Sequence, residues 1–170
     1  MSERKTNNLA VDVLREYLDY DQNTGVFTWR KRHPRTKYLL GKQTGSEARG
    51  GYIKINLFKV TYAAHRLAWI YVTGRHPKKE IDHINGDRKD NRFCNLRESD
   101  RSQNQENQRR AMVTNKAGLL GVRTYNNRNI YGASICVKGN RIFLGCFKDK
   151  RDAHAAYLDA KRRLHEGCTI

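Results

Sequence analysis

Long apolar runs are missing from this sequence. No stretch approaches the roughly 18 consecutive apolar residues that a membrane-spanning helix needs, so the sequence excludes a transmembrane protein. The N-terminal segment carries charges throughout its one apolar stretch and lacks the hydrophobic core and small-residue cleavage site of a signal peptide. We therefore expect a protein of the cytoplasm or nucleoid, with no membrane partner.

Cysteine is scarce, and its spacing does not suit a metal. Cys94, Cys136, Cys146 and Cys168 lie 42, 10 and 22 residues apart, without a C-x-x-C pair. Structural zinc sites use closely spaced Cys and His pairs, so we expect no structural zinc. In a cytosolic protein these side chains are reduced thiols, and two of them fall in candidate strands, where Cys behaves as a small hydrophobic residue.

Acidic residues are outnumbered two to one by basic residues. The 170 residues include 34 Lys and Arg against 17 Asp and Glu, which gives a formal net charge of +17. Such a balance favours a polyanionic partner and makes a small-molecule substrate a poor candidate. Both parts of the chain contribute, because residues 118–167 carry a net charge of +6 and residues 1–117 carry +11.

The first part of the chain mixes helical and strand patterns. Apolar residues at i, i+3 and i+7 predict a helix over 11–18, and Gly74 predicts the end of a second helix over 62–72. Residues 31–50 are basic and have no periodic pattern, so we expect no regular structure there. The remaining expected elements are a turn over 21–25 and strands over 26–30 and 51–58.

The last part of the chain predicts a small sheet and one helix. Three short runs, 121–125, 131–138 and 141–147, are separated by turn-forming residues and indicate an antiparallel sheet. Asp149 is a candidate N-cap for a helix that ends near Gly167. We therefore expect an α+β protein with a first domain over 1–108 (core motif 65–108), a linker over 109–117 and a second domain over 118–170.

Residues 81–104 carry the strongest chemical signal. Asp82 and His83 end a short apolar segment and precede a turn, where a bulge or strand end can direct both side chains to one site. A carboxylate can hold a hard divalent cation while a neutral imidazole takes a proton from water. Ser99 or Asp100 can cap a following helix, which gives the order strand, turn, strand, helix.

These residues resemble the HNH endonucleases of the ββα-metal fold, especially the phage and intron-type homing enzymes. The resemblance implies that His83 is the general base and that Asp82 and Asn104 bind one Mg²⁺ or Mn²⁺ ion, with Asn107 as the alternative to Asn104. Asn95 would brace the hairpin so that His83 is correctly directed. The residues that carry the resemblance are His65-Arg66-Leu67, Asp82-His83, Asn85-Gly86-Asp87, Asp90-Asn91, Asn95-Leu96-Arg97 and Asn104.

For His65, Arg66 and Asn91 we consider two alternative roles each. We favour a structural or phosphate-contact role over direct chemistry for His65 and Arg66. Asn91 is favoured as a turn residue over a metal ligand. Arg97 and Arg101 are expected to contact DNA.

The C-terminal part resembles the apetala-type domain of plant ethylene-response factors. The resemblance rests on GVR at 121–123, LGCF at 144–147 and the alanine-rich segment 152–167, and it implies a three-stranded sheet that enters the DNA major groove with a helix behind it. Alternation places Val122, Ala133, Ile135, Val137 and Leu144 toward the helix. The expected DNA-contacting residues face outward: Arg123, Tyr125, Ser134, Lys138, Arg141 and Phe143.

The two resemblances together predict a sequence-guided, metal-dependent endonuclease of homing type that cuts double-stranded DNA, with a monomer favoured. A different class stays open, a non-catalytic DNA-binding regulator on a nuclease-derived fold. An RNA-binding protein is a third and weaker alternative, because the sheet lacks exposed aromatic residues at the spacing of an RNA-recognition motif.

Overall fold

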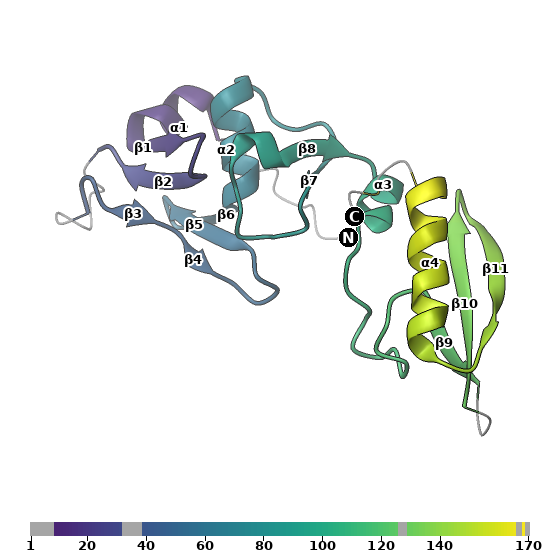
Figure 1. Cartoon of the computed structure of the whole chain (residues 1–170). Coiled ribbons are helices and arrows are strands. Elements are labelled where there is room, and N and C mark those ends of the chain that lie inside the picture. Colours follow the sequence, from purple (N-terminus) through teal and green to yellow (C-terminus); the bar gives the residue numbers. More distant parts are fainter. Residues whose placement is uncertain (1–8, 32–38, 126–128, 166–167, 169–170) are drawn as a thin grey trace, which may run out of the picture. The chain divides into compact units, whose positions relative to one another are not determined.

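A computed structural model describes residues 9–31, 39–125, 129–165 and 168. The chain divides into two compact units, residues 1–98 and 99–170, and each combines helices with small antiparallel sheets (Figure 1). The predicted α+β class is therefore confirmed. The domain boundaries predicted at 108 and 118 stay predictions.

In its described residues, the first unit contains two α-helices and three small sheets. The strand orders are β1-β2-β3, β4-β5-β6 and β7-β8. The bounds are α1 (Val11–Tyr17), β1 (Leu18–Asp21), β2 (Val26–Trp29), β3 (Gln43–Thr44), β4 (Ser46–Glu47), β5 (Ile53–Leu57), β6 (Val60–Ala63), α2 (Ala64–Thr73), β7 (Glu80–His83), the 3-10 turn η1 (Phe93–Asn95) and β8 (Leu96–Ser99).

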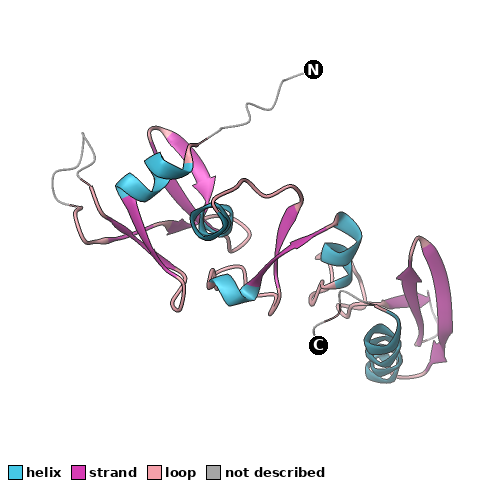
Figure 2. Ribbon diagram, turned by 90° about the horizontal axis from the view of Figure 1, so that it is seen from above, coloured by secondary structure: helices cyan, strands magenta, loops and turns pink. Residues whose placement is uncertain are grey.

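Helix α2 lies in the core of this unit. Figure 2 shows it end-on among the strands, and Leu67, Ala68 and Ile70 are buried on it. The core also contains Leu14, Leu18, Phe27, Ile55 and Leu57 from α1, β1, β2 and β5. Each Å² of apolar surface buried in this core contributes about 25 cal/mol to the stability of the fold. The core therefore holds in place the strands that flank the loop before β8.

Two expectations for this unit were wrong in part. Helix α2 begins at Ala64 and not at Tyr62, because Tyr62 and Ala63 extend β6 and pair with Ile55 and Lys54. Residues 31–50 are not without structure where they are described: β3 pairs with β2, and β4 pairs with β5. Strands of two residues are too short to show alternation in a sequence. Residues 32–38 of that stretch lie outside the described residues.

The carboxylate of Glu98 ties β8 to the segment between α2 and β7. Its oxygens accept from Arg75 Nη1 and Nη2 at 3.0 and 2.7 Å and from the Lys78 backbone N–H at 2.6 Å. The Arg75 hydrogen bonds lower the pKa of Glu98 from 4.5 to about 2. This contact therefore stabilises the fold fully above pH 4.5.

Replacing Glu98 with glutamine is expected to weaken the dependence of the free energy of unfolding on pH in the acidic range. A carboxyl whose folded pKa is depressed contributes stability that is lost as the pH falls from about 4.5 toward about 2. The wild-type free energy of unfolding should fall across this window more steeply than that of Glu98→Gln. Urea unfolding at a series of pH values measures both slopes, and equal slopes would contradict the contact.

The second unit consists of helix α3 and a three-stranded sheet covered by helix α4 (Figure 1). The sheet has the antiparallel order β11-β10-β9, which confirms the predicted sheet. The bounds are α3 (Arg101–Glu106), β9 (Val122–Tyr125), β10 (Ile130–Val137), β11 (Asn140–Phe147) and α4 (Lys150–Leu164). Helix α4 is capped by the Asp149 side chain, which accepts from the Arg151 backbone N–H at 2.6 Å, as expected. The helix ends at Leu164, and Gly167, which was expected to end it, lies outside the described residues.

The inner face of this sheet has the predicted composition. Val122, Ala133 and Ile135 are buried, and Val137 and Leu144 pack against the same cores. The end of the expected linker joins this packing, because Ala117 is buried beside Val122. Cys136 and Cys146 lie in strands as expected, but both are exposed and not packed as hydrophobic residues.

None of the helices in the described ranges combines the length and apolar content that crossing a membrane requires.

Candidate active site

Strand β7 carries the Asp82-His83 pair. Ile81, Asp82 and His83 are all buried, with 7, 7 and 3% of their surface exposed. Along the chain, β7 is followed by a loop over 84–92, then η1, β8 and α3, so the predicted order of strand, turn, strand, helix is found. The ββα-metal arrangement itself stays a prediction.

Asp82 forms an ion pair with Arg97 of β8. Arg97 Nη2 and Nε donate to the same carboxylate oxygen, Oδ2, at 2.9 and 3.2 Å. A buried carboxylate requires compensation for its lost hydration, and Arg97 supplies it while fixing the carboxylate plane. The sequence does not predict this pair, since it places Arg97 only among the expected DNA-contacting residues.

His83 lies in a buried group of rings. Its centroid is 5.1 Å from that of His65 and 6.0 Å from that of Tyr52. Burial lowers the pKa of His83, and a hydrogen bond with Asn91 partly offsets this effect. A neutral imidazole at neutral pH is the form that can accept a proton from water.

His65 lies next to His83, and the sequence allows either a structural role or a phosphate contact for it. It is 9% exposed at the start of α2, and its buried Nδ1 atom has no hydrogen-bond partner among the residues that the structure describes. Burial and the nearby His83 ring lower the pKa of His65 to about 3. This position favours the structural reading over phosphate contact for His65, whereas Arg66 is exposed.

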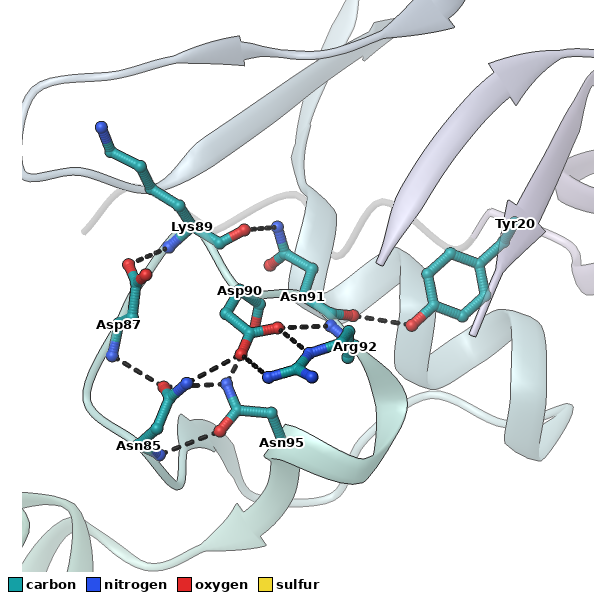
Figure 3. A network of polar contacts seen from close by, with 8 residues as sticks. All are labelled: Tyr20, Asn85, Asp87, Lys89, Asp90, Asn91, Arg92 and Asn95. Carbon is teal, nitrogen blue, oxygen red and sulfur yellow. Dashed lines mark hydrogen bonds and ion pairs between the residues drawn. The ribbon is translucent and has the colours of Figure 1, made fainter. Parts of the chain in front are cut away.

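Asn95 braces the loop between β7 and η1 (Figure 3). Its Oδ1 atom accepts from the Asn85 backbone N–H at 2.9 Å, and its Nδ2 atom donates to Asn85 Oδ1 at 3.0 Å and to the Asp90 carbonyl at 2.8 Å. The Asn95 carbonyl accepts from the Ile84 N–H at 2.8 Å. These contacts join both ends of the loop that follows His83.

Asp90 closes the same network. It accepts from Arg92 Nε and Nη2 at 2.8 and 2.6 Å and from Asn85 Nδ2 at 2.7 Å. The Arg92 hydrogen bond is the main cause that lowers the pKa of Asp90. The loop is therefore held by charge-assisted hydrogen bonds, which are stronger than neutral ones.

Asn91 contacts His83, and the sequence does not predict this contact. It was expected to be a turn residue, yet it is 3% exposed and its Oδ1 atom lies 3.3 Å from His83 Nε2. Its backbone carbonyl accepts from the Tyr20 hydroxyl at 2.6 Å (Figure 3). An Asp-Asn pair gives no sequence signal for such a role beyond turn formation.

The β4–β5 hairpin contacts the loop that follows His83. The Arg88 guanidinium lies 4.8 Å from the centroid of the Tyr52 ring and donates to the Gly50 carbonyl at 2.9 Å. Lys89 forms an ion pair with Glu47 of β4 at 2.7 Å. The loop after His83 is thus fastened to this hairpin as well.

The remaining predicted residues lie in the second unit. Asn104 is on α3, which begins with a capping box between Asp100 and Gln103, and Asn107 is its C-cap. Asp100, and not Ser99, is therefore the cap. Arg101 is exposed on the same helix. The roles of Asn104, Asn107 and Arg101 stay predictions.

The outer face of the C-terminal sheet carries the predicted DNA-contacting residues. Cross-strand pairs place Ser134 beside Phe143 and Cys136 beside Arg141, and Phe143 is 59% exposed. Arg123, Tyr125 and Lys138 are also exposed. This face therefore combines cations with apolar rings.

The donors for a metal are few. No group of three or more His, Cys, Asp or Glu side chains that could hold an ion occurs among the residues that the structure describes. A cation at Asp82 would therefore depend on one carboxylate together with carboxamide, phosphate and water oxygens, a set that suits Mg²⁺.

Comparison with known proteins finds one similarity. Residues 62–106, about a quarter of the chain, match the model of an HNH endonuclease family. No curated protein matches the chain, and no solved structure does. The matched residues run from β6 to the end of α3 and include the buried Asp82-His83 pair. The match supports an HNH nuclease, a hydrolase that acts on DNA.

Proposed function

We propose that this protein is a divalent-metal-dependent DNA endonuclease of homing type that hydrolyses phosphodiester bonds in duplex DNA. The observation that carries the proposal is the buried Asp82-His83 pair within the residues that match HNH endonucleases. Burial favours the neutral form of the His83 imidazole, which is the form that a general base requires.

Asp82 and Asn104 would hold one Mg²⁺ or Mn²⁺ ion. A carboxylate and a carboxamide oxygen fit a hard cation, because Mg²⁺ takes one or two protein oxygens and completes its shell with phosphate and water. When bound, the ion would supply positive charge for the pentacovalent phosphate and the leaving oxygen. Both Arg97 hydrogen bonds go to Oδ2 of Asp82, which orients the carboxylate.

His83 would act as the general base. It takes a proton from the water that attacks the phosphorus in line, and this step requires the neutral imidazole that burial favours. Asn95 holds the loop that follows His83 through its bonds to Asn85 and Asp90. The expected products carry 3′-hydroxyl and 5′-phosphate ends, as the family resemblance implies.

Cleavage of supercoiled plasmid carrying DNA from the protein's own locus tests this proposal. With Mg²⁺ or Mn²⁺ a monomer with one site is expected to nick one strand, and EDTA should stop the reaction until metal is restored in excess. A protein that shifts this DNA in a gel but never cuts it with either metal would contradict the proposal.

A non-catalytic DNA-binding regulator is the second candidate. The Arg97–Asp82 ion pair favours it, because the carboxylate already has a cationic partner. The plasmid assay separates the two candidates, since the regulator binds DNA without changing its topology.

The C-terminal sheet is proposed to grip and partly read duplex DNA. The exposed Arg123 and Arg141 can form bidentate contacts with guanine, and Lys138 can contact phosphate. Tyr125, Ser134 and Phe143 contribute the remaining contacts of this face. Arg66, Arg97 and Arg101 are proposed to contribute the contacts near the cleavage site.

The double variant Arg123→Ala/Arg141→Ala is expected to weaken DNA binding at least 10-fold, because each base-reading arginine contributes about 1 to 3 kcal/mol. The matched control is Arg151→Ala/Arg162→Ala, which removes the same charge from exposed positions of α4. Fluorescence anisotropy with labelled duplex DNA measures both affinities. Equal losses in the two double variants would indicate non-specific charge and contradict a reading face.

A further inference from the structure

The carboxamide of Asn91 has a fixed orientation. Its Nδ2 atom donates to the Lys89 carbonyl at 3.0 Å, and its Oδ1 atom lies 3.3 Å from His83 Nε2. The reversed orientation would place two carbonyl oxygens against each other without a hydrogen between them. Oδ1 therefore faces His83, and a carboxamide oxygen can only accept a hydrogen bond.

An imidazole nitrogen that faces an acceptor must carry the proton. In neutral histidine only one ring nitrogen is protonated, so the lone pair is on Nδ1 when Nε2 donates to Asn91. In the charged form both nitrogens carry protons, and the proton on Nδ1 is the one that leaves without breaking this bond. The contact thus favours the tautomer of neutral His83 that carries its proton on Nε2.

We propose that Asn91 is a positioning residue that keeps a proton on His83 Nε2 and makes Nδ1 the atom that accepts the proton of the attacking water. The catalytic part of this inference rests on the proposed nuclease function. The proton moves from water to Nδ1, and the resulting hydroxide forms a bond to the phosphorus as the bond from phosphorus to the 3′ oxygen breaks. The 3′ oxygen leaves with the bonding electrons and takes a proton from a solvent water molecule.

Asn91 is in turn anchored by the N-terminal hairpin β1–β2. The Tyr20 hydroxyl donates to the Asn91 carbonyl at 2.6 Å, and burial raises the pKa of Tyr20, which keeps the hydroxyl a donor. The Phe93 N–H donates to the Gln22 carbonyl at 3.3 Å. This hairpin lies outside residues 62–106, so the site depends on a part of the chain that the family match does not include.

Nitrogen NMR of the full chain labelled with ¹⁵N-histidine tests the proton placement directly. The His83 signals are assigned by their loss in His83→Gln. At neutral pH the wild type is expected to show a protonated Nε2 and an unprotonated Nδ1. Asn91→Leu removes the acceptor and should shift the ring toward a mixture of tautomers, whereas Asn91→Asp retains an acceptor and should keep the Nε2 proton.

Activity of the same variants gives the second measurement. Asn91→Leu is expected to lower kcat for plasmid nicking about 100-fold, within the usual range for general-base catalysis, and to change KM for DNA less than threefold. Asn91→Asp should recover part of this loss. Tyr20→Phe should lower kcat by a smaller factor, and the control Tyr17→Phe, whose ring packs against Phe58, should not.

Three results would overturn parts of this inference separately. A wild-type spectrum with the proton on Nδ1 would refute the proton placement, and it requires no variant to fold. An unchanged tautomer in Asn91→Leu would show that Asn91 does not select it. A wild type that keeps the Nε2 proton but cuts no DNA would support the placement and refute the proposed nuclease function.

Discussion

Replacing His83 with alanine is expected to abolish plasmid nicking while leaving DNA binding near the wild-type level. The imidazole is 3% exposed, and no other residue is proposed to take the proton from water. General-base catalysis contributes about 10² to 10⁴ in rate, so we expect kcat to fall about 10³-fold. Single-turnover nicking in Mg²⁺ measures the rate, and a gel shift measures binding.

The matched control is His76→Ala in the same unit. His76 Nε2 contacts the Leu9 carbonyl at 3.1 Å, and His76 has no role in the proposed mechanism. This variant loses the same side chain and should nick DNA at the wild-type rate. Nicking by His83→Ala at a comparable rate, with both proteins folded by circular dichroism, would remove His83 from the mechanism.

The C-terminal sheet and helix were predictable because local patterns and tertiary packing agree there. Alternation along β10 puts Ala133 and Ile135 on the buried face, and Asp149 caps α4. Lys161 was not predictable. It is 1% exposed because its ammonium donates to the Gln108 carbonyl and lies 5.9 Å from the Tyr157 ring, contacts that only folding brings together.

The sequence predicts the chemically active residues of the candidate site but not the contacts that hold them in place. The sequence indicates Asp82, His83 and Asn95 because their types and spacing resemble a known family. It gives no indication that Arg97 pairs with Asp82 or that Tyr20 holds Asn91. Both contacts join residues that are distant in sequence, 15 and 71 positions apart, so no local periodicity can reveal them.

Gly25 joins the N-terminal hairpin to the loop that carries Asn91. Its φ is +73°, and a Cβ atom added there would lie 2.5 Å from the Arg92 nitrogen and 2.6 Å from the Asn91 carbonyl carbon. Both neighbours are backbone atoms, which cannot move aside without moving the loop. The hairpin can therefore approach the loop this closely only without a side chain.

Gly25→Ala is expected to destabilise the first unit by about 2 to 5 kcal/mol. The left-handed backbone costs about 1 to 2 kcal/mol for an L-residue, and the steric conflict adds about 1 to 3 kcal/mol. Displacing Asn91 should also lower the nicking rate of the protein that still folds. Urea unfolding followed by tryptophan fluorescence measures the first effect, since both tryptophans, Trp29 and Trp69, lie in this unit.

Gly41→Ala separates the two contributions. Gly41 has the same φ of +73°, but none of the described residues lies within 4 Å of its added Cβ atom, so only the left-handed backbone is penalised and the loss should stay near 1 to 2 kcal/mol. The difference between the two variants then measures the close approach of the hairpin to the Asn91 loop. Equal losses would mean that the loop moves aside freely. In that case the hairpin could not be the element that holds Asn91 against His83.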